Sequence, residues 1–134
     1  MTSQLNVDTI KGQTAETSIT IQGEGTATTN LQQGLAKVWG QGEGDTTTLI
    51  DSFNQSAFTD NATGQFIHNF TNNMGNDDYS GLTTGISGDH LISGTGTTTT
   101  SSCRFDHYNQ SNGAVDTGLH CMVIFGDLAL WQVC

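Results

Sequence analysis

The chain has 134 residues and a net charge of −10, with Lys11, Lys37 and Arg104 as its basic residues. Nucleic acids and anionic membranes are bound through clustered cations, so this charge argues against both as partners. Apolar residues make up 34% of the chain and charged residues 12%, whereas disordered chains combine low hydrophobicity with many charges. The polarity comes from Thr, Ser, Asn and Gln, which suits strands with one solvated face, and the thin apolar content favours further burial between subunits.

The first residues, MTSQLNVDTIKG, lack both the basic start and the apolar run of a secretory signal. No window of the sequence approaches the ~20 apolar residues of a membrane span. Cys103, Cys121 and Cys134 are odd in number and lack CxxC spacing. We therefore expect reduced thiols in a protein made in a cytoplasm.

The N-terminal segment carries short alternating patterns that predict two strands or a single hairpin. Residues 5–10, LNVDTI, alternate Leu5 and Val7 with polar residues, and residues 17–23, TSITIQG, place Ile19 and Ile21 on one face. A two-stranded hairpin alone is marginal in water. This segment is therefore expected to pack on something else.

Residues 30–39 carry the pattern of a short amphipathic helix, with Asn30 as its N-cap and Gly40 at its end. Apolar residues recur there at helical spacing, namely Leu31, Leu35, Val38 and, beside them, Trp39. The following GQGEGD, residues 40–45, has the composition of a linker. The sequence thus predicts an N-terminal segment over residues 1–45 and a second domain over residues 46–134.

From residue 46 onward, strand-like runs alternate with turn-forming segments, at a spacing of roughly a dozen residues that predicts an antiparallel sandwich or jelly roll. The segment LHCMVIF is apolar on both faces, so we expect a central strand with Val123 and Phe125 in the core. Residues 95–102, TGTTTTSS, form either an exposed loop or the start of an edge strand. The expected strands cover residues 47–52, 65–70, 79–86, 99–108 and 119–125, with a less regular one around 56–59.

Candidate metal ligands do not converge in the sequence. His120 and Cys121 are neighbours in a strand and point to opposite faces, while Cys103 and His107 share a face but lie roughly 13 Å apart at the ~3.3 Å rise of a strand. The GxSxG, HExxH and P-loop motifs are absent from the sequence. We therefore predict no metal site, no catalytic residues, no cofactor and no enzymatic activity.

Two features of the sequence have more than one interpretation. The loop NNMGNDD, residues 72–78, resembles a weak calcium loop around Asn76 and Asp78 but lacks the distal Glu of an EF-hand, and a polar turn is the favoured alternative. Trp39 and Trp131 suit either sugar stacking or subunit contacts, and we favour subunit contacts.

Several segments resemble, in the same order, a known group of phage proteins. LNVDTIKGQTAETSITIQGEG followed by TTNLQQGLAKVW is similar to the start of small virion structural and tail-fibre-like proteins of tailed phages of cyanobacteria and other aquatic bacteria. The later DSFNQSAFTDNATGQF, MGNDDYSG and MVIFGD are similar to the C-terminal domain of that group. The likeness covers most of the chain and is weakest over residues 87–118.

The resemblance implies a homotrimer in which a short N-terminal β stem and the helix join an antiparallel, jelly-roll-like β-sandwich head. Residues 1–45 would then serve attachment and trimerisation. The helices would meet at the three-fold axis through Leu31, Leu35, Val38 and Trp39. The attachment surface would use the apolar residues Leu5, Val7, Ile10, Ile19 and Ile21.

Two functions remain open at this point. The first is a decoration, or cement, protein bound in many copies to the major capsid protein on the outside of the capsid, which the shortness of the chain favours. The second is a short tail fibre or tail-tip protein that is held by tail proteins and binds a host-surface glycan, which the Thr/Asn/Gly-rich loops favour. Both functions place the protein on the virion surface after synthesis in the host cytoplasm.

Overall fold

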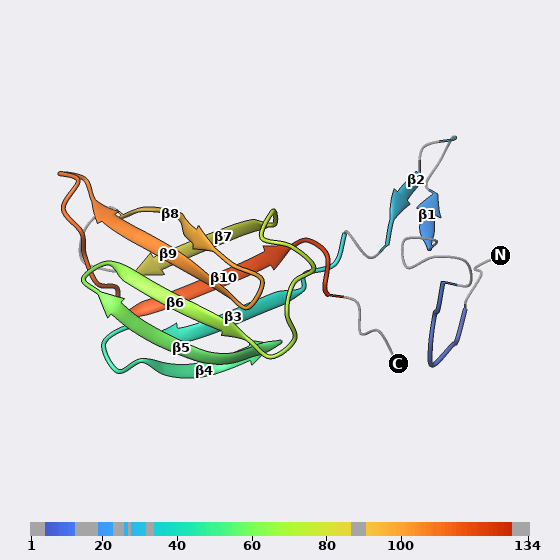
Figure 1. Ribbon diagram of the computed structural model, residues 1–134, viewed down its shortest axis with the longest axis horizontal. Coiled ribbons are helices and arrows are strands. Elements are labelled where there is room, and N and C mark those ends of the chain that lie inside the picture. Colours follow the sequence, from blue (N-terminus) through green and yellow to red (C-terminus); the bar gives the residue numbers. More distant parts are fainter. Residues whose placement is uncertain are drawn as a thin grey trace. The chain divides into compact units, whose positions relative to one another are not determined.

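The structure is a computed structural model that describes residues 5–12, 19–22, 26, 28–31, 34–86 and 91–129. The chain divides into two compact units, Met1–Leu35 and Ala36–Cys134. The described residues form ten β-strands and no helix, which confirms the all-β prediction (Figure 1). Among them, no helical segment has the length and apolarity needed to cross a membrane.

The first unit contains one short hairpin. Strand β1 (Thr20–Gln22) pairs antiparallel with β2 (Thr28–Asn30), with Ile21 opposite Thr29. The N–H of Leu31 extends this pairing by donating to the carbonyl oxygen of Ile19 at 2.9 Å. Residues 5–10, which the alternating pattern predicts as a strand, carry no strand.

The predicted helix over residues 30–39 is wrong. Asn30 ends β2, Leu31 and Gly34 lie in turns, and Val38 begins β3; of the segment, residues 32 and 33 alone lie outside the described part. A ten-residue helix is marginal without a surface to pack on. Here the last two residues of the segment instead begin β3, with Val38 buried and Trp39 facing outward.

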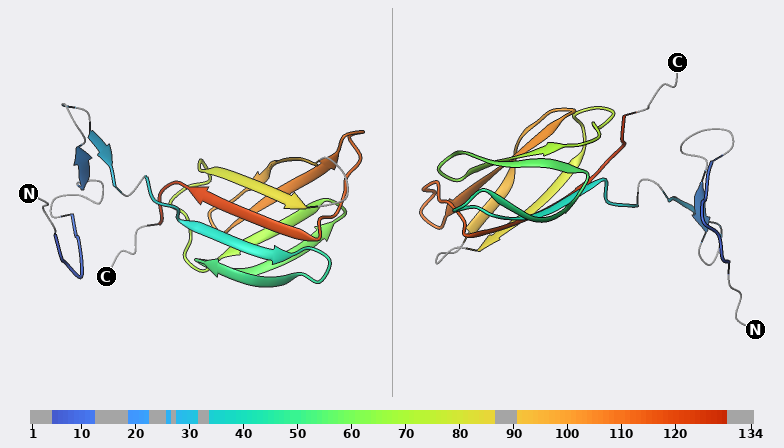
Figure 2. Two further views of the ribbon diagram at one scale, coloured as in Figure 1. Left: turned by 180° about the vertical axis from the view of Figure 1, so that it is seen from behind. Right: turned by 90° about the horizontal axis from the view of Figure 1, so that it is seen from below.

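The second unit is a sandwich of two four-stranded antiparallel sheets (Figures 1 and 2). Sheet I has the order β4-β3-β10-β7, and its strands are β3 (Val38–Glu43), β4 (Thr48–Phe53), β7 (Ser80–Ile86) and β10 (Leu119–Phe125). Sheet II has the order β5-β6-β9-β8, and its strands are β5 (Gln55–Ala62), β6 (Gln65–Phe70), β8 (Leu91–Thr98) and β9 (Ser102–Asn109). The predicted antiparallel sandwich is therefore confirmed.

The jelly-roll-like connection of the strands stays a prediction, and one finer expectation about the architecture fails. The predicted Gly-rich linker at residues 40–45 is not a linker, because residues 40–43 belong to β3 in the interior of sheet I. The division between the units accordingly falls after Leu35 and not after residue 45.

Between β4 and β5 the chain passes from sheet I to sheet II through a single residue, Asn54, which has a positive φ of 58°. Asparagine tolerates this left-handed conformation better than most residues. Its side-chain amide nitrogen donates to the carbonyl oxygens of Lys37 and Asn72, both at 3.1 Å, and its oxygen accepts from the N–H of Asn72 at 2.7 Å. Asn54 therefore fixes the corner by tying three segments together.

Glycines on the inner side of β3 and just after it allow the two sheets to approach closely. A Cβ on Gly42 would lie 2.7 Å from Cδ1 of Phe58, and a Cβ on Gly44 would overlap the carbonyl oxygen of Thr117. The alternation of glycine with Gln41 and Glu43 is thus a strand pattern in which the inward positions carry no side chain. Aromatic rings of sheet II occupy the space that this leaves.

We expect Gly44→Ala to lower the free energy of unfolding by about 1–3 kcal/mol, because the overlapping atom belongs to the backbone and cannot rotate away. Gly94→Ala in β8 is the matched control, since a Cβ there meets nothing within 4 Å. Urea unfolding of both variants measures the difference. Equal stability of the two variants would contradict the close packing at Gly44.

The apolar core lies between the sheets and extends into the connection between β6 and β7. Its centre is Phe105, which is 0% exposed. The other buried apolar residues in contact with it or with each other are Val38, Phe70, Met74, Cys103, Met122 and Ile124, with Tyr79 and Leu128 packed at the margin. The expected core residues Val123 and Phe125 point the other way, because His120, Met122 and Ile124 take the inward positions of β10.

Candidate interaction surface

Three histidine rings lie together between the two sheets. His68 on β6, His107 on β9 and His120 on β10 are all 0% exposed. The ring centroids of His68 and His120 are 4.7 Å apart, and those of His107 and His120 are also 4.7 Å apart. The aromatic rings around them are Phe58, Phe66 and Phe105.

A continuous chain of hydrogen bonds runs through two of these rings, and one end of it sets its direction. The hydroxyl of Thr83 donates to the carbonyl oxygen of Cys121 at 3.0 Å, so Thr83 Oγ1 accepts from Nε2–H of His120 at 2.9 Å. Nδ1 of His120 then accepts from Nε2–H of His68 at 3.0 Å, and Nδ1 of His68 accepts from the side-chain amide of Gln55 at 2.7 Å. Both rings are therefore neutral and protonated at Nε2.

Burial keeps the three histidines uncharged. It lowers the pKa of His68 to about 3 and the pKa of His120 to about 2, with the neighbouring histidines lowering both further. Burial also lowers the pKa of His107, against the weaker opposing effect of Asp106. Because none of these rings reaches solvent, the cluster serves to fill and order the core and does not meet a ligand from outside.

The described part of the chain holds no group of three or more His, Cys, Asp or Glu side chains that could hold a metal ion. His120 points into the core and Cys121 to the outside of sheet I, as the strand alternation predicts. In the loop of residues 72–78, the side-chain oxygen of Asn76 accepts the N–H of Asp78 at 3.0 Å, which is an Asx turn. That geometry is the one a polar turn adopts.

Sheet I lies in front in the left view of Figure 2. Its outer face exposes several large apolar side chains, and we call it the apolar face. Its large exposed residues, between 39% and 64% exposed, are Trp39, Ile50, Phe53, Leu82 and Ile86. The outward positions of β10 between them are half-buried and comprise Leu119, Cys121, Val123 and Phe125. Antiparallel sheets that face water on one side normally alternate apolar with polar residues, and this sheet is apolar on both sides.

Strand register aligns the central residues of the apolar face into one row. Phe53 pairs with Trp39 across β4 and β3, Trp39 pairs with Val123 across β3 and β10, and Val123 pairs with Leu82 across β10 and β7. Paired residues on neighbouring strands point to the same face and contact each other. The row therefore crosses all four strands of sheet I.

The outer face of sheet II is polar by comparison. Its central row joins Thr59, Ile67 and Arg104 by register, and Arg104 forms an ion pair with Asp106 on the same strand, with Nε and Oδ1 2.8 Å apart. Gln65 and Asn69 are the other outward residues of β6. The outer face of sheet II also exposes Ile92 and Tyr108, which pair across β8 and β9. Its central row is nevertheless polar at Thr59 and Arg104, whereas the central row of sheet I is apolar on all four strands.

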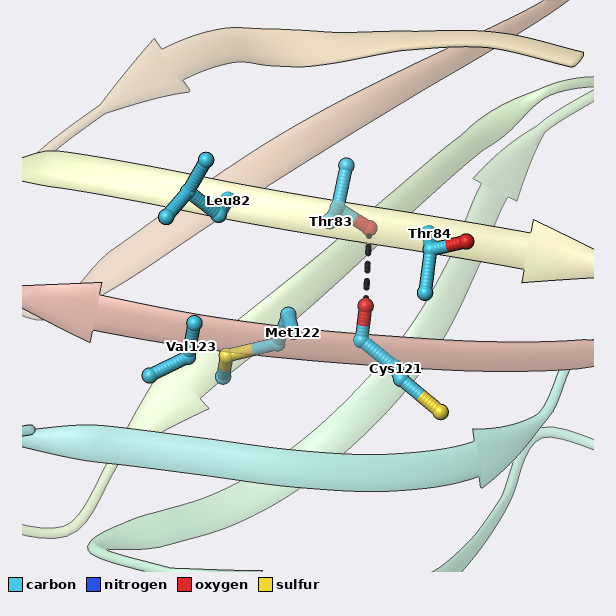
Figure 3. A pocket seen from close by; sticks show the side chains of 6 residues that line it. All are labelled: Leu82, Thr83, Thr84, Cys121, Met122 and Val123. Carbon is cyan, nitrogen blue, oxygen red and sulfur yellow. Dashed lines mark hydrogen bonds between the residues drawn. The ribbon is translucent and has the colours of Figure 1, made fainter.

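A shallow groove lies on the apolar face between β7 and β10 (Figure 3). Leu82 and Thr84 border it on one side and Cys121 and Val123 on the other, and the hydrogen bond from Thr83 to the carbonyl oxygen of Cys121 crosses it. Cys121 is a free, half-buried cysteine, whereas the other described free cysteine, Cys103, is fully buried.

The residues predicted for attachment all lie in the first unit. Leu5, Val7, Ile10 and Ile21 are between 52% and 78% exposed, and Ile19 is half-buried beside the hairpin. They are thus accessible within their unit, as an attachment surface requires. Whether they contact a particle stays a prediction.

The residues predicted for the trimer interface do not share one helical face. Leu31 lies in the turn after β2, Leu35 is exposed, and Trp39 is part of the apolar face. Val38 is 0% exposed and packs in the core of its own sandwich, so it is not available to another subunit. Trp131, the other tryptophan singled out above, lies outside the described residues.

The apolar face was not predicted from the sequence, although the sequence contains a signal for it. The run LHCMVIF is apolar at successive positions, which is typical of a strand covered on both sides.

Comparison of the chain with protein-family models, curated proteins and solved structures found no match.

Proposed function

We propose that this chain is a virion structural protein of a tailed phage, and specifically a homotrimeric decoration protein on the outside of the capsid. The proposal rests on the resemblance of the ordered segments from LNVDTI to MVIFGD. The observation that supports it best is the presence of two separate sets of exposed apolar side chains, one in each unit of the chain.

A decoration protein needs one surface for the particle and another for its sister copies. The first unit offers Leu5, Val7, Ile10 and Ile21 for the particle, in a short segment whose hairpin is marginal alone. The second unit offers the apolar face for the sister copies. A net charge of −10 then keeps neighbouring particles apart and soluble.

A short tail fibre or tail-tip protein that binds a host-surface glycan is the second candidate. It is favoured by segments of the sandwich that are rich in Thr or Asn, namely residues 94–97 of β8 and residues 71–73 after β6. These residues are exposed except for Asn72, which is half-buried. Such segments carry many hydroxyl and amide groups that can bond to sugars. The two candidates differ in what they bind and so can be separated in solution.

We expect purified full-length protein to rebind to capsids that lack it, and the triple variant Leu5→Asp, Val7→Asp, Ile10→Asp to lose this binding. The three side chains are exposed, so the charges should remove apolar contact with the particle without unfolding the sandwich. Co-sedimentation with capsids measures binding, and circular dichroism of the variant serves as the folding control.

The same experiment separates the two candidates. A protein that ignores capsids but competes with phage for host cells would be a tail protein, and the decoration proposal would be wrong. Full binding of the triple variant to capsids would be consistent with a decoration protein, but it would show that Leu5, Val7 and Ile10 are not the attachment surface.

A further inference from the structure

We propose that the apolar face of sheet I is the contact between copies of this chain, so that a second copy covers it in the assembled protein. The inference rests on the proposed function, because it assigns the subunit contact of the proposed homotrimer to one face. It places that contact on strands β3, β4, β7 and β10 of the sandwich. Of the residues first expected at the trimer interface, Trp39 belongs to this face, whereas Leu31, Leu35 and Val38 do not.

The size of the face suits a subunit contact. Its five large residues are 39–64% exposed and present on the order of 500 Å² of apolar surface, taking roughly 200 Å² for each large side chain. The half-buried outward residues of β10 and the polar residues between them add to this area. The whole face therefore approaches the ~800 Å² per partner of a stable interface. Its apolar part is as large as the largest patches of ordinary monomers, about 300–600 Å², which are often functional.

The charge of the face suits a second copy of the same acidic chain. The sequence has 13 acidic residues and three basic ones, yet the outward residues of these four strands include only Glu43 and Asp51 as acids and no base. Two copies can therefore meet there with little repulsion. A basic partner would require a cluster of acids on this face, and the described residues place none there.

The kinds of side chain favour a protein surface over a glycan. Leu82, Ile86, Ile50 and Val123 are aliphatic and offer neither a stacking ring nor a hydrogen bond to a sugar. In a cyclic trimer this face of each copy packs against a different surface of the next copy, and aliphatic side chains can lose their water against any apolar protein surface. Trp39 and Phe53 lie side by side in the central row, which is where binding energy concentrates in protein interfaces.

Substitution of one face residue by glutamate tests the inference on the full chain. We expect wild-type protein to have three times the 14.2 kDa mass of the chain by light scattering, and Leu82→Glu to reduce the mass toward that of a single chain. Ile92→Glu in β8 is the matched control, because Ile92 is 56% exposed and Leu82 is 59% exposed, but Ile92 lies on sheet II. The control should keep the full mass.

Labelling of Cys121 keeps the inference testable even if Leu82→Glu fails to fold. In a Cys134→Ser background, Cys121 is the thiol outside the core, since Cys103 is buried and burial raises its pKa to about 12. We expect a thiol reagent to modify Cys121 many-fold more slowly in the assembled protein than after dilution to single chains. In Leu82→Glu the labelling should be fast at all concentrations.

Fast labelling of Cys121 in an assembled protein, or dissociation by Ile92→Glu with an intact Leu82→Glu assembly, would overturn the inference and place the contact elsewhere. A single-chain protein whose Cys121 becomes protected only when capsids are added would also overturn it, because the capsid would then be the occupant. That last result would leave the virion role standing, so failure of the inference is distinguishable from failure of the proposed function.

Discussion

Lowering the pH from 7 to 5 should destabilise the sandwich by several kcal/mol, before most carboxylates begin to titrate. The cause is the buried cluster of His68, His107 and His120, which is neutral in the folded protein. The hydrogen-bond chain through His68 and His120 leaves no acceptor for a second ring proton. Charging either ring would direct two N–H groups at each other or place a charge in the core.

The sign and size of the effect follow from the pKa values of the two states. In the unfolded chain a histidine has a pKa of about 6.5, whereas folding lowers the pKa of His68 to about 3 and that of His120 to about 2. The unfolded state thus binds more protons below pH ~6.5, and the stability present above that pH is lost as the pH falls toward the folded values. Between pH 7 and 5 this costs about 2 kcal/mol for each of these two histidines.

His107 acts in the same direction, because burial lowers its pKa as well. A loss of about 4 kcal/mol or more is a large part of the 5–15 kcal/mol that holds an ordinary domain together. Urea unfolding at several pH values and one fixed protein concentration measures it. His107→Leu should show a shallower pH dependence than wild type. A free energy of unfolding that is flat between pH 7 and 5 would mean that the rings are charged or hydrated in the folded state.

The parts of the fold that could be predicted from the sequence are those where one pattern dominates. Residues 65–70 and 119–125 form strands with the predicted bounds, because alternating or continuous apolar residues are flanked there by turn formers. Strand β3 could not be predicted in this way. Its inward positions are Val38, Gly40 and Gly42, and glycines carry no apolar signal even when they lie in a core.

The orientation of β10 shows a second limit. Its two faces are nearly equal in apolarity, and the sequence favours burial of Val123 and Phe125 over burial of His120. In the structure His120 is buried and Val123 and Phe125 face outward. His120 is placed inward because it completes a hydrogen-bond chain with His68 and Thr83, which lie far from it in the sequence. Partners of this kind cannot be recognised from local periodicity. The resulting display of Val123 and Phe125 on the outside is what creates the apolar face.

Replacing Phe105 by alanine should lower the free energy of unfolding by about 3–5 kcal/mol, which is the range for removing a fully buried aromatic ring. Phe105 is 0% exposed on β9 and contacts both the apolar cluster and the histidine rings, with its centroid 5.7 Å from that of His68 and 5.9 Å from that of His120. The ring also fills the space beside Gly81 on β7, where an added Cβ would lie 3.0 Å from Cζ of Phe105. Its loss would leave a cavity that spans both sheets.

Tyr108→Ala is the matched control for this substitution, since Tyr108 is an aromatic residue on the same strand that faces outward and is 38% exposed. Its removal should cost less than about 1 kcal/mol, because the lost ring is already partly hydrated. Urea unfolding at pH 7 should show a lower midpoint for Phe105→Ala at an unchanged slope. Because His68 and His120 pack on this ring, Phe105→Ala should also admit water to the cluster and weaken the acid sensitivity of the protein. Equal costs for the two variants would place Phe105 outside the core and remove the physical basis for keeping the histidines neutral.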